Sequence, residues 1–212
     1  MYRNLVKKKA APIFAAKKDM PITAEQANEL IRRRRAIFPN TYTDEPIPDE
    51  VIAEILENAN WAPTHKRTEP WRFKVFRGKA LPRLGHYLAQ WYKENTPAGQ
   101  FLERKYDKAL NNPQRSSCVI AICMQRDPQE RIPEWEELAA VACAVQNIWL
   151  SCTAYGIGCY WSSPQSILEA DEFLGLKKGE RCLGLFYMGY HNMPAVPGKR
   201  QPVEEKVEWV RE

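Results

Sequence analysis

Residues 134–156 form a long apolar segment, EWEELAAVACAVQNIWLSCTAYG, which follows Pro133 and ends at Gly156. Glycine is the usual residue just past a helix end, so the segment predicts one long α-helix. Its apolar residues cover much of the helix circumference and do not form a single stripe. Such a helix lies either at the centre of a domain or against a partner subunit.

The remaining elements fit around this helix in one domain. Alternating or continuous apolar runs predict strands at 71–76, 116–124 and 181–190, and GCYWSSP predicts a strand that enters a turn. Helices are expected from Thr23 toward Pro39, from Asp49 to Pro63, and across 80–110. Since strands and helices mix without strict alternation, the pattern predicts a single α+β, three-layer domain over residues 23–212, preceded by a basic arm over residues 1–22.

Composition limits which partners and which cellular compartment we expect for this chain. No continuous run of about 18 apolar residues is present, so we expect no membrane-spanning helix and no membrane partner. The net charge of +5 is mild and suits an anionic cofactor or a phosphorylated electron donor as well as nucleic acid. The 6 cysteines form no CxxC pair, which favours buried free thiols, no metal site and, by default, the reducing cytoplasm.

The run Arg32–Arg35 needs an explanation, because four consecutive helical residues point in four directions. Leu30 and Ile31 are expected to face the core, which turns Arg34 inward or into a cleft. An inward guanidinium needs an anionic partner, and phosphate is one that arginine binds in a bidentate way. On this run alone, a solvated basic helix end ranks first, a phosphate site second and a nucleic-acid patch third.

Three further segments carry residues suited to a ligand. The loop 61–71, WAPTHKRTEPW, holds one histidine and two cations between two indoles. Gly156–Pro164, GIGCYWSSP, permits close backbone approach before two serines. The segment 197–202, PGKRQP, places two cations between prolines. Each segment alone also fits an ordinary loop, strand corner or exposed tail.

Taken in order, these segments resemble the nitroreductase family, and especially its smaller bacterial members. The RRS-like motif corresponds to Arg33–Arg35, the AP…PW loop to Ala62–Trp71, the GIG-x-x-W-x-S element to Gly156–Ser163, and the closing GKR-x-P-x-E-E element to residues 198–205. The resemblance covers residues 23–210. Two departures, Arg67 and Trp61, change residues that lie near the flavin in that family.

The resemblance implies a nitroreductase-like α+β fold, with a mixed and mainly antiparallel sheet flanked by helices, in an intertwined homodimer with FMN at the interface. The residues implied at the phosphate are Arg33, Arg35, Lys199 and Arg200. Those implied near the ribityl chain and ring are Arg34, His65 and Arg67. Those implied to face the isoalloxazine are Trp161, Ser162 and Ser163.

The function implied is an oxidoreductase that takes hydride from NADH or NADPH onto flavin N5 and passes it to a nitroaromatic, a quinone or a related acceptor by ping-pong kinetics. No side chain need act as a catalytic nucleophile or acid. A specialised member, such as a dehalogenase, a flavin-fragmenting enzyme or a biosynthetic dehydrogenase, is the alternative. A basic nucleic-acid-binding protein ranks last, because aromatic and basic residues are not interleaved as a base-stacking surface requires.

Overall fold

The computed structural model describes residues 22–212, so all but the last residue of the expected arm lies outside the described residues. The strands are β1 (Trp71–Phe76), β2 (Cys118–Gln125), β3 (Ile157–Ser162) and β4 (Glu180–Tyr190). The α-helices are α1 (Ala24–Arg33), α2 (Asp49–Asn60), α3 (Ala80–Asn95), α4 (Glu103–Gln114), α5 (Glu134–Ala154), α6 (Gln165–Leu168) and α7 (Asp171–Leu174). The 3-10 turns are η1 (Pro39–Thr41), η2 (His65–Arg67), η3 (Ala98–Gln100) and η4 (Val203–Lys206).

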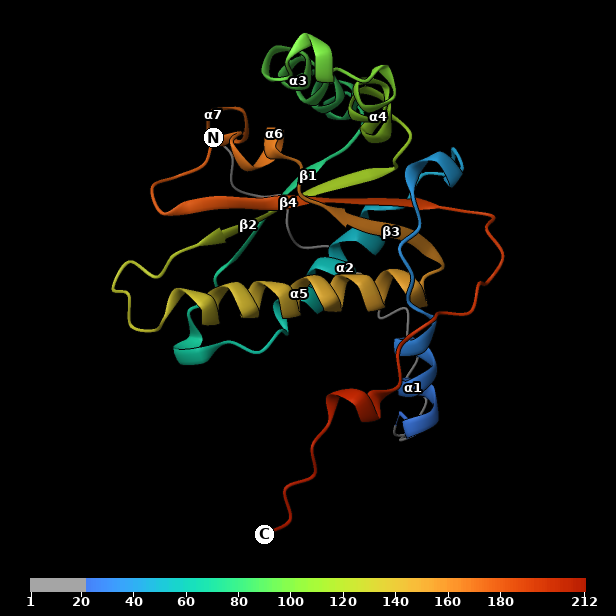
Figure 1. Ribbon diagram of the computed structural model, residues 1–212, viewed down its shortest axis with the longest axis vertical. Helices are drawn as coiled ribbons and strands as arrows, with labels where there is room; N and C mark the ends of the chain where they lie inside the picture. Colours follow the sequence, from blue (N-terminus) through green and yellow to red (C-terminus); the bar gives the residue numbers. More distant parts are fainter. Residues whose placement is uncertain (1–21) are drawn as a thin grey trace, which may run out of the picture.

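The four strands form one sheet in the order β1-β2-β4-β3, between two helical layers (Figure 1). Helices α5 and α2 cover one face, while α3, α4, α6 and α7 lie on the other. Every strand pair in the described sheet is antiparallel. The predicted three-layer α+β architecture is therefore confirmed, but the mixed sheet is wrong for the described residues.

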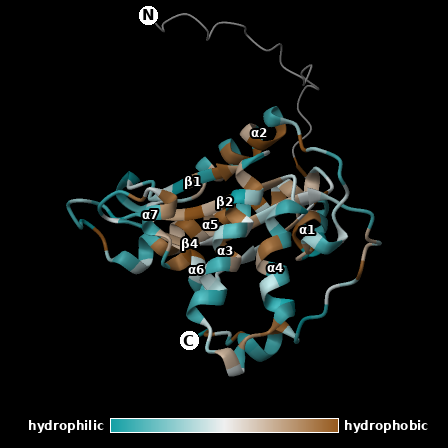
Figure 2. Ribbon diagram, turned by 90° about the horizontal axis from the view of Figure 1, so that it is seen from above, coloured by the Kyte–Doolittle hydropathy of each residue, from teal (hydrophilic) through white to brown (hydrophobic). Residues whose placement is uncertain are grey.

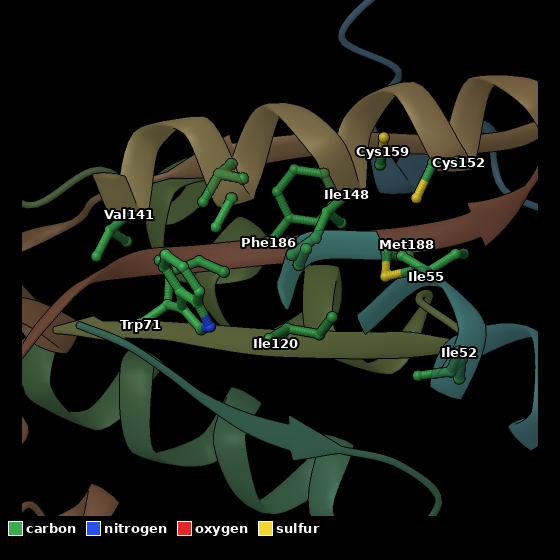
Figure 3. Close-up of a cluster of buried hydrophobic side chains, with 14 of the residues drawn as sticks. Ile52, Ile55, Trp71, Ile120, Val141, Ile148, Cys152, Cys159, Phe186 and Met188 are labelled. Carbon is green, nitrogen blue, oxygen red and sulfur yellow. The ribbon is translucent and has the colours of Figure 1, made fainter. Parts of the chain in front are cut away.

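Strand β2 is buried on both faces and so divides the core in two. Ile120 and Met124 point into the cluster beneath α5 and α2, which Figure 3 shows in part. Val119 and Ala121, on the opposite face, pack with residues of α3, α6 and α7. Apolar residues accordingly gather around the sheet, and the loops at the margin are mostly hydrophilic (Figure 2). This continuous apolar run is what predicted a buried strand here.

Helix α5 runs the length of the sheet and confirms the predicted long helix. Its inward residues, Val141 and Ile148 among them, pack against the sheet and α2 (Figure 3). By length and composition, α5 also meets the criterion for a membrane-crossing helix, so the sequence-based exclusion was too broad. Its packing and the buried Glu137 near its first turn identify it as a core helix.

The outward face of α5 is apolar and open. Trp135 is 68% exposed and Leu138 is 39% exposed, while Ala142 and Cys143 also face outward. Cys143 is therefore the exception to the prediction of buried free thiols; the other five are buried, and all six are free. A helix that is apolar on both sides needs a second layer on its open side.

Candidate cofactor site

Helix α1 starts as its sequence predicts and ends earlier than expected. Thr23 and Gln26 form a reciprocal capping box at its N-terminus. The last helical residue is Arg33, and Arg34 leaves the helix with ψ of 127°. The prediction that α1 buries a stripe is wrong within one chain, since none of its residues is fully buried and Ile31 is 55% exposed.

Arg34 nevertheless turns toward the body of the protein, as its position predicted. Its guanidinium lies 4.6 Å from the ring centroid of Trp149 on α5, which is cation–π geometry. The pKa of Arg34 is lowered, first by partial burial and then by repulsion from Arg200. A second cation thus lies close to a half-buried first one, an arrangement that an anion would stabilise.

Arg35 attaches the C-terminal tail to the end of α1. Its Nε donates to the Val196 carbonyl at 3.0 Å, and its Nη1 donates to the carbonyls of Arg32 at 2.6 Å and Arg34 at 2.7 Å. A Cβ on Gly198 would approach the Arg35 Nη2 atom to 2.6 Å, so only glycine fits there without a shift. Figure 1 shows the tail descending from β4 and passing beside α1.

The structure thus brings Arg34, Arg35 and Arg200 into one region, and exposed Lys199 precedes Arg200 in the tail. In the described part of the chain, none of these cations takes part in an ion pair with a carboxylate. Arg33 does not join them: its side chain is 66% exposed and pairs with Glu29 at 3.1 Å. Several cations without a carboxylate partner suit the binding of a phosphate.

The predicted ring-facing segment lies at the end of β3. Trp161 is half-buried, and its indole N–H donates to the Leu183 carbonyl at 3.1 Å. A Cβ on Gly184 would lie 2.6 Å from the Trp161 Nε1 atom, so this glycine lets the indole rest against β4. Ser162 is half-buried and Ser163 is exposed. The tryptophan is fixed, and the two hydroxyls remain close to solvent.

The loop with His65 and Arg67 is held in a costly conformation. Lys66, Arg67 and Glu69 have φ of 50°, 54° and 42°, in the left-handed region that non-glycine residues seldom adopt. The Thr64 hydroxyl accepts a hydrogen bond from the Glu69 N–H at 3.1 Å. His65 Nδ1 lies 2.6 Å from Glu136 Oε2. The surroundings therefore fix this loop to the first turn of α5.

The two halves of the predicted site lie at opposite ends of α5 (Figure 1). Glu136 holds His65, whereas Trp149 contacts Arg34. At a rise of about 1.5 Å per residue, these two helix positions are roughly 20 Å apart. One chain therefore does not bring His65 and Arg67 together with Arg34, Arg35 and Arg200 around a single ring.

Trp149 is the site residue that the sequence did not indicate. Its indole N–H donates to the Arg35 carbonyl at 2.9 Å, and its ring packs edge-on against Phe186 at 5.4 Å. It thereby joins the end of α1 to the core beneath Arg34. In sequence it looked like one more apolar residue of the long helix.

Known proteins give the context for this geometry. A model of the nitroreductase family matches residues 31–190. The Bacillus subtilis protein named "Putative NAD(P)H nitroreductase YfhC" is 31% identical over 183 residues, covering 84% of this chain and 91% of that protein.

Two solved structures are similar as well. A nitroreductase-like family protein from Bacillus cereus aligns with a TM-score of 0.76 and 26% identity, covering 93% of this chain and 100% of that chain. A structure from Desulfovibrio desulfuricans, described as a putative nitroreductase in complex with FMN, aligns with a TM-score of 0.68 and 26% identity, covering 89% and 99% of the two chains. The predicted resemblance and the predicted oxidoreductase class are confirmed: this chain belongs to the nitroreductase family.

Proposed function

We propose that this protein is an FMN-dependent oxidoreductase that uses NADH or NADPH to reduce a nitroaromatic, a quinone or a related acceptor. The observation that carries the proposal is the cluster of Arg34, Arg35 and Arg200 at the meeting point of α1 and the tail. The relatives support it, since one is named for NAD(P)H and a similar structure is a complex with FMN.

The residues present fit a flavin phosphate. Arg34 and Arg200 repel each other in the absence of an anion, and Arg35 uses Nε and Nη1 on backbone carbonyls, which leaves Nη2 beside Gly198 for another acceptor. We assign the phosphate to Arg34, Arg35, Lys199 and Arg200. Arg33, implied there by the resemblance, is assigned no phosphate contact because it is occupied by Glu29.

The chain's own residues bind and orient, and none needs to act as a nucleophile. Trp161 supplies a fixed apolar surface for a planar ring on the α5 side of the sheet, and the exposed Ser163, just beyond the end of β3, offers a hydroxyl there. Ser162 faces the other side of the sheet. The chemistry that bound FMN would supply is two-electron transfer from NAD(P)H to the acceptor. The donor would give a hydride, and the acceptor would take up two electrons with protons at the same place.

We further propose that the site is completed by a second copy of this chain in a homodimer. The loop with His65 and Arg67 lies roughly 20 Å along α5 from Arg34, estimated from the helix rise, so a second chain is needed to bring both to one ring. The open apolar face of α5 offers the contact surface. The tail, in which Trp209 is 77% exposed, offers an arm that reaches beyond its own chain (Figure 1).

A visible spectrum of the purified protein tests the cofactor. Flavin bands near about 370 and 450 nm are expected, either directly or after FMN is added and excess is removed. NADH and NADPH oxidation is then followed with nitro compounds and with quinones. A protein that remains colourless with added FMN contradicts the proposal.

A further inference from the structure

A ligand-sized cavity lies on the side of the sheet away from α5. Its volume is about 810 Å³, and it is bounded by α3, α4, the residues around η1 and the ends of β3 and β4. Cavities of roughly 300–1,000 Å³ are typical of small-molecule sites. Figure 1 shows the α3–α4 pair rising from this face of the sheet.

The inner wall of the cavity is aromatic. Tyr160 and Tyr187 stack with ring centroids 4.8 Å apart and planes 13° apart. Phe38 packs against Tyr160 at 4.9 Å, and Trp91 and Tyr92 line the cavity from α3. Flat aromatic side chains arranged in this way favour a planar, unsaturated ligand.

The outer wall is one face of α4. Lys105, Lys108 and Asn112 recur at helical spacing on α4 and line the cavity together with Arg115, the residue that caps the end of the helix. The carboxylates of Glu103 and Asp107 on α4 do not line it. The cavity lining includes no acidic residue. Among residues 22–212, the three cations take part in no ion pair.

The aromatic wall and the cationic wall are joined. Asn112 Nδ2 donates to the Tyr160 hydroxyl at 3.3 Å, which fixes this part of α4 over the aromatic floor. Burial raises the pKa of Tyr160, so its hydroxyl stays protonated and neutral at ordinary pH. A ligand placed on the tyrosines would therefore meet a neutral floor and a positive rim.

We infer that this cavity binds a planar aromatic anion, such as a benzoate that carries a reducible nitro group. The ring would stack on the aromatic wall and the carboxylate would face Lys108 and Arg115. Ser162 lines the cavity and also belongs to the segment assigned to the flavin. The inference thus deepens the proposed function, and only the reduction of the bound ring rests on that function.

The test compares 4-nitrobenzoate with 4-nitrobenzamide, which differ in the charge of one substituent. Binding to the full chain is measured by titration calorimetry, with and without added FMN, and by quenching of tryptophan fluorescence. We expect the carboxylate to bind about tenfold more tightly than the amide, as a charge-assisted hydrogen bond provides. The double variant Lys108→Gln/Arg115→Gln should lose this preference while still binding the amide.

The matched control is Arg104→Gln, which removes an exposed cation of α4 that does not line the cavity. It should keep the preference for the carboxylate. Equal binding of the two compounds by the unmodified protein, or a preference that survives in the double variant, would overturn the inference. A preference for the carboxylate, without NAD(P)H-dependent reduction of any of the nitro compounds or quinones tested, would support the cavity assignment and contradict the proposed function instead.

Discussion

Arg34 carries its positive charge in a half-buried position close to a second cation. Partial burial and then repulsion from Arg200 lower its pKa, while the ring of Trp149 stacks beneath the guanidinium. A phosphate dianion would offset both the burial and the repulsion. We expect Arg34→Gln to weaken FMN binding about tenfold to a hundredfold, the usual range for a lost charge-assisted hydrogen bond. Fluorescence titration of the flavin measures the change.

Arg33→Gln is the matched control for that experiment, because Arg33 is the next residue, carries the same charge and faces Glu29 in solvent. Its FMN affinity should stay within about twofold of the unmodified protein, as expected for an exposed ion pair of little energetic value. If Arg33→Gln weakened binding as much as Arg34→Gln, the assignment implied by the family resemblance would be right and ours wrong.

His191 lies at the start of the C-terminal tail, and we expect it to make the stability of the folded protein sensitive to acid. Its Nδ1 accepts the Met193 N–H at 3.1 Å, and burial lowers its pKa from the usual 6.5. The unfolded chain therefore takes up this proton first, so stability is full above pH 6.5 and falls as pH drops from 6.5 toward the lower folded pKa. His191→Gln should unfold with a smaller drop in midpoint between about pH 7.5 and 5.5. Identical pH profiles for the two proteins would contradict this expectation.

Which residues share a site was only partly predictable from sequence. The inward turn of Arg34 was expected from helical spacing to Leu30 and Ile31, yet Arg34 lies beyond the helix end and Ile31 is exposed. The predicted inward direction of the Arg34 side chain was right for another reason. After Arg34 the chain turns back toward β3, where the Ile37 N–H donates to the Cys159 carbonyl. The part played by Trp149 depends on packing between distant segments, which periodicity does not encode.

At the scale of elements, the first turn of α5 is fixed to the end of β2 by a buried carboxylate. Glu137 is fully buried, pairs with Arg126 and accepts the Asp127 N–H at 2.9 Å. Glu137→Ala would leave a guanidinium and an amide without their partner, so we expect a loss of about 3–5 kcal/mol in the free energy of unfolding. Urea denaturation followed by circular dichroism gives this value.

The comparison variant is Glu134→Gln on the same turn. Glu134 pairs with Arg181 at 2.8 Å, and both side chains are about half exposed, at 51% and 47%. The Glu134→Gln variant should lose less than about 1 kcal/mol in the free energy of unfolding, because water replaces this exposed ion pair at little cost. Similar losses in the two variants would mean that burial of Glu137 has little energetic importance.

Elements with a strong period or a firm boundary were predictable. Strand β1 occupies the residues of the alternating WRFKVF run, and α5 lies between Pro133 and Gly156 as expected. The short helices α6 and α7 were not expected, since four residues carry too little pattern to identify a helix. The direction of each strand is likewise not encoded in its local sequence. The family resemblance implied a mixed sheet, whereas the sheet in the described chain is antiparallel throughout.

At the scale of the whole molecule, a single chain leaves two features unexplained. One face of α5 is apolar and open, and the tail beyond His191 is exposed along its described length while it keeps an extended course past α1 (Figure 1). A second copy of the chain whose α5 packs against the first α5 would cover the open apolar face and would give the tail a surface to contact. The same contact would bring His65 and Arg67 of one copy toward Arg34 of the other.

Ala142→Glu tests this arrangement, because Ala142 is exposed on the open face of α5 and its replacement leaves the core of one chain untouched. Two-fold symmetry would place two new carboxylates in the buried contact, where an unpaired charge is strongly unfavourable. Light scattering should then give twice the chain mass for the unmodified protein and one chain mass for the variant, with FMN binding lost together with the dimer. The control variant Lys93→Glu, at an exposed position on α3, should remain dimeric and keep the yellow colour of bound FMN. A monomeric Ala142→Glu protein that held FMN at full affinity would show that one chain completes the site, and the roughly 20 Å separation along α5 would then no longer argue for a partner.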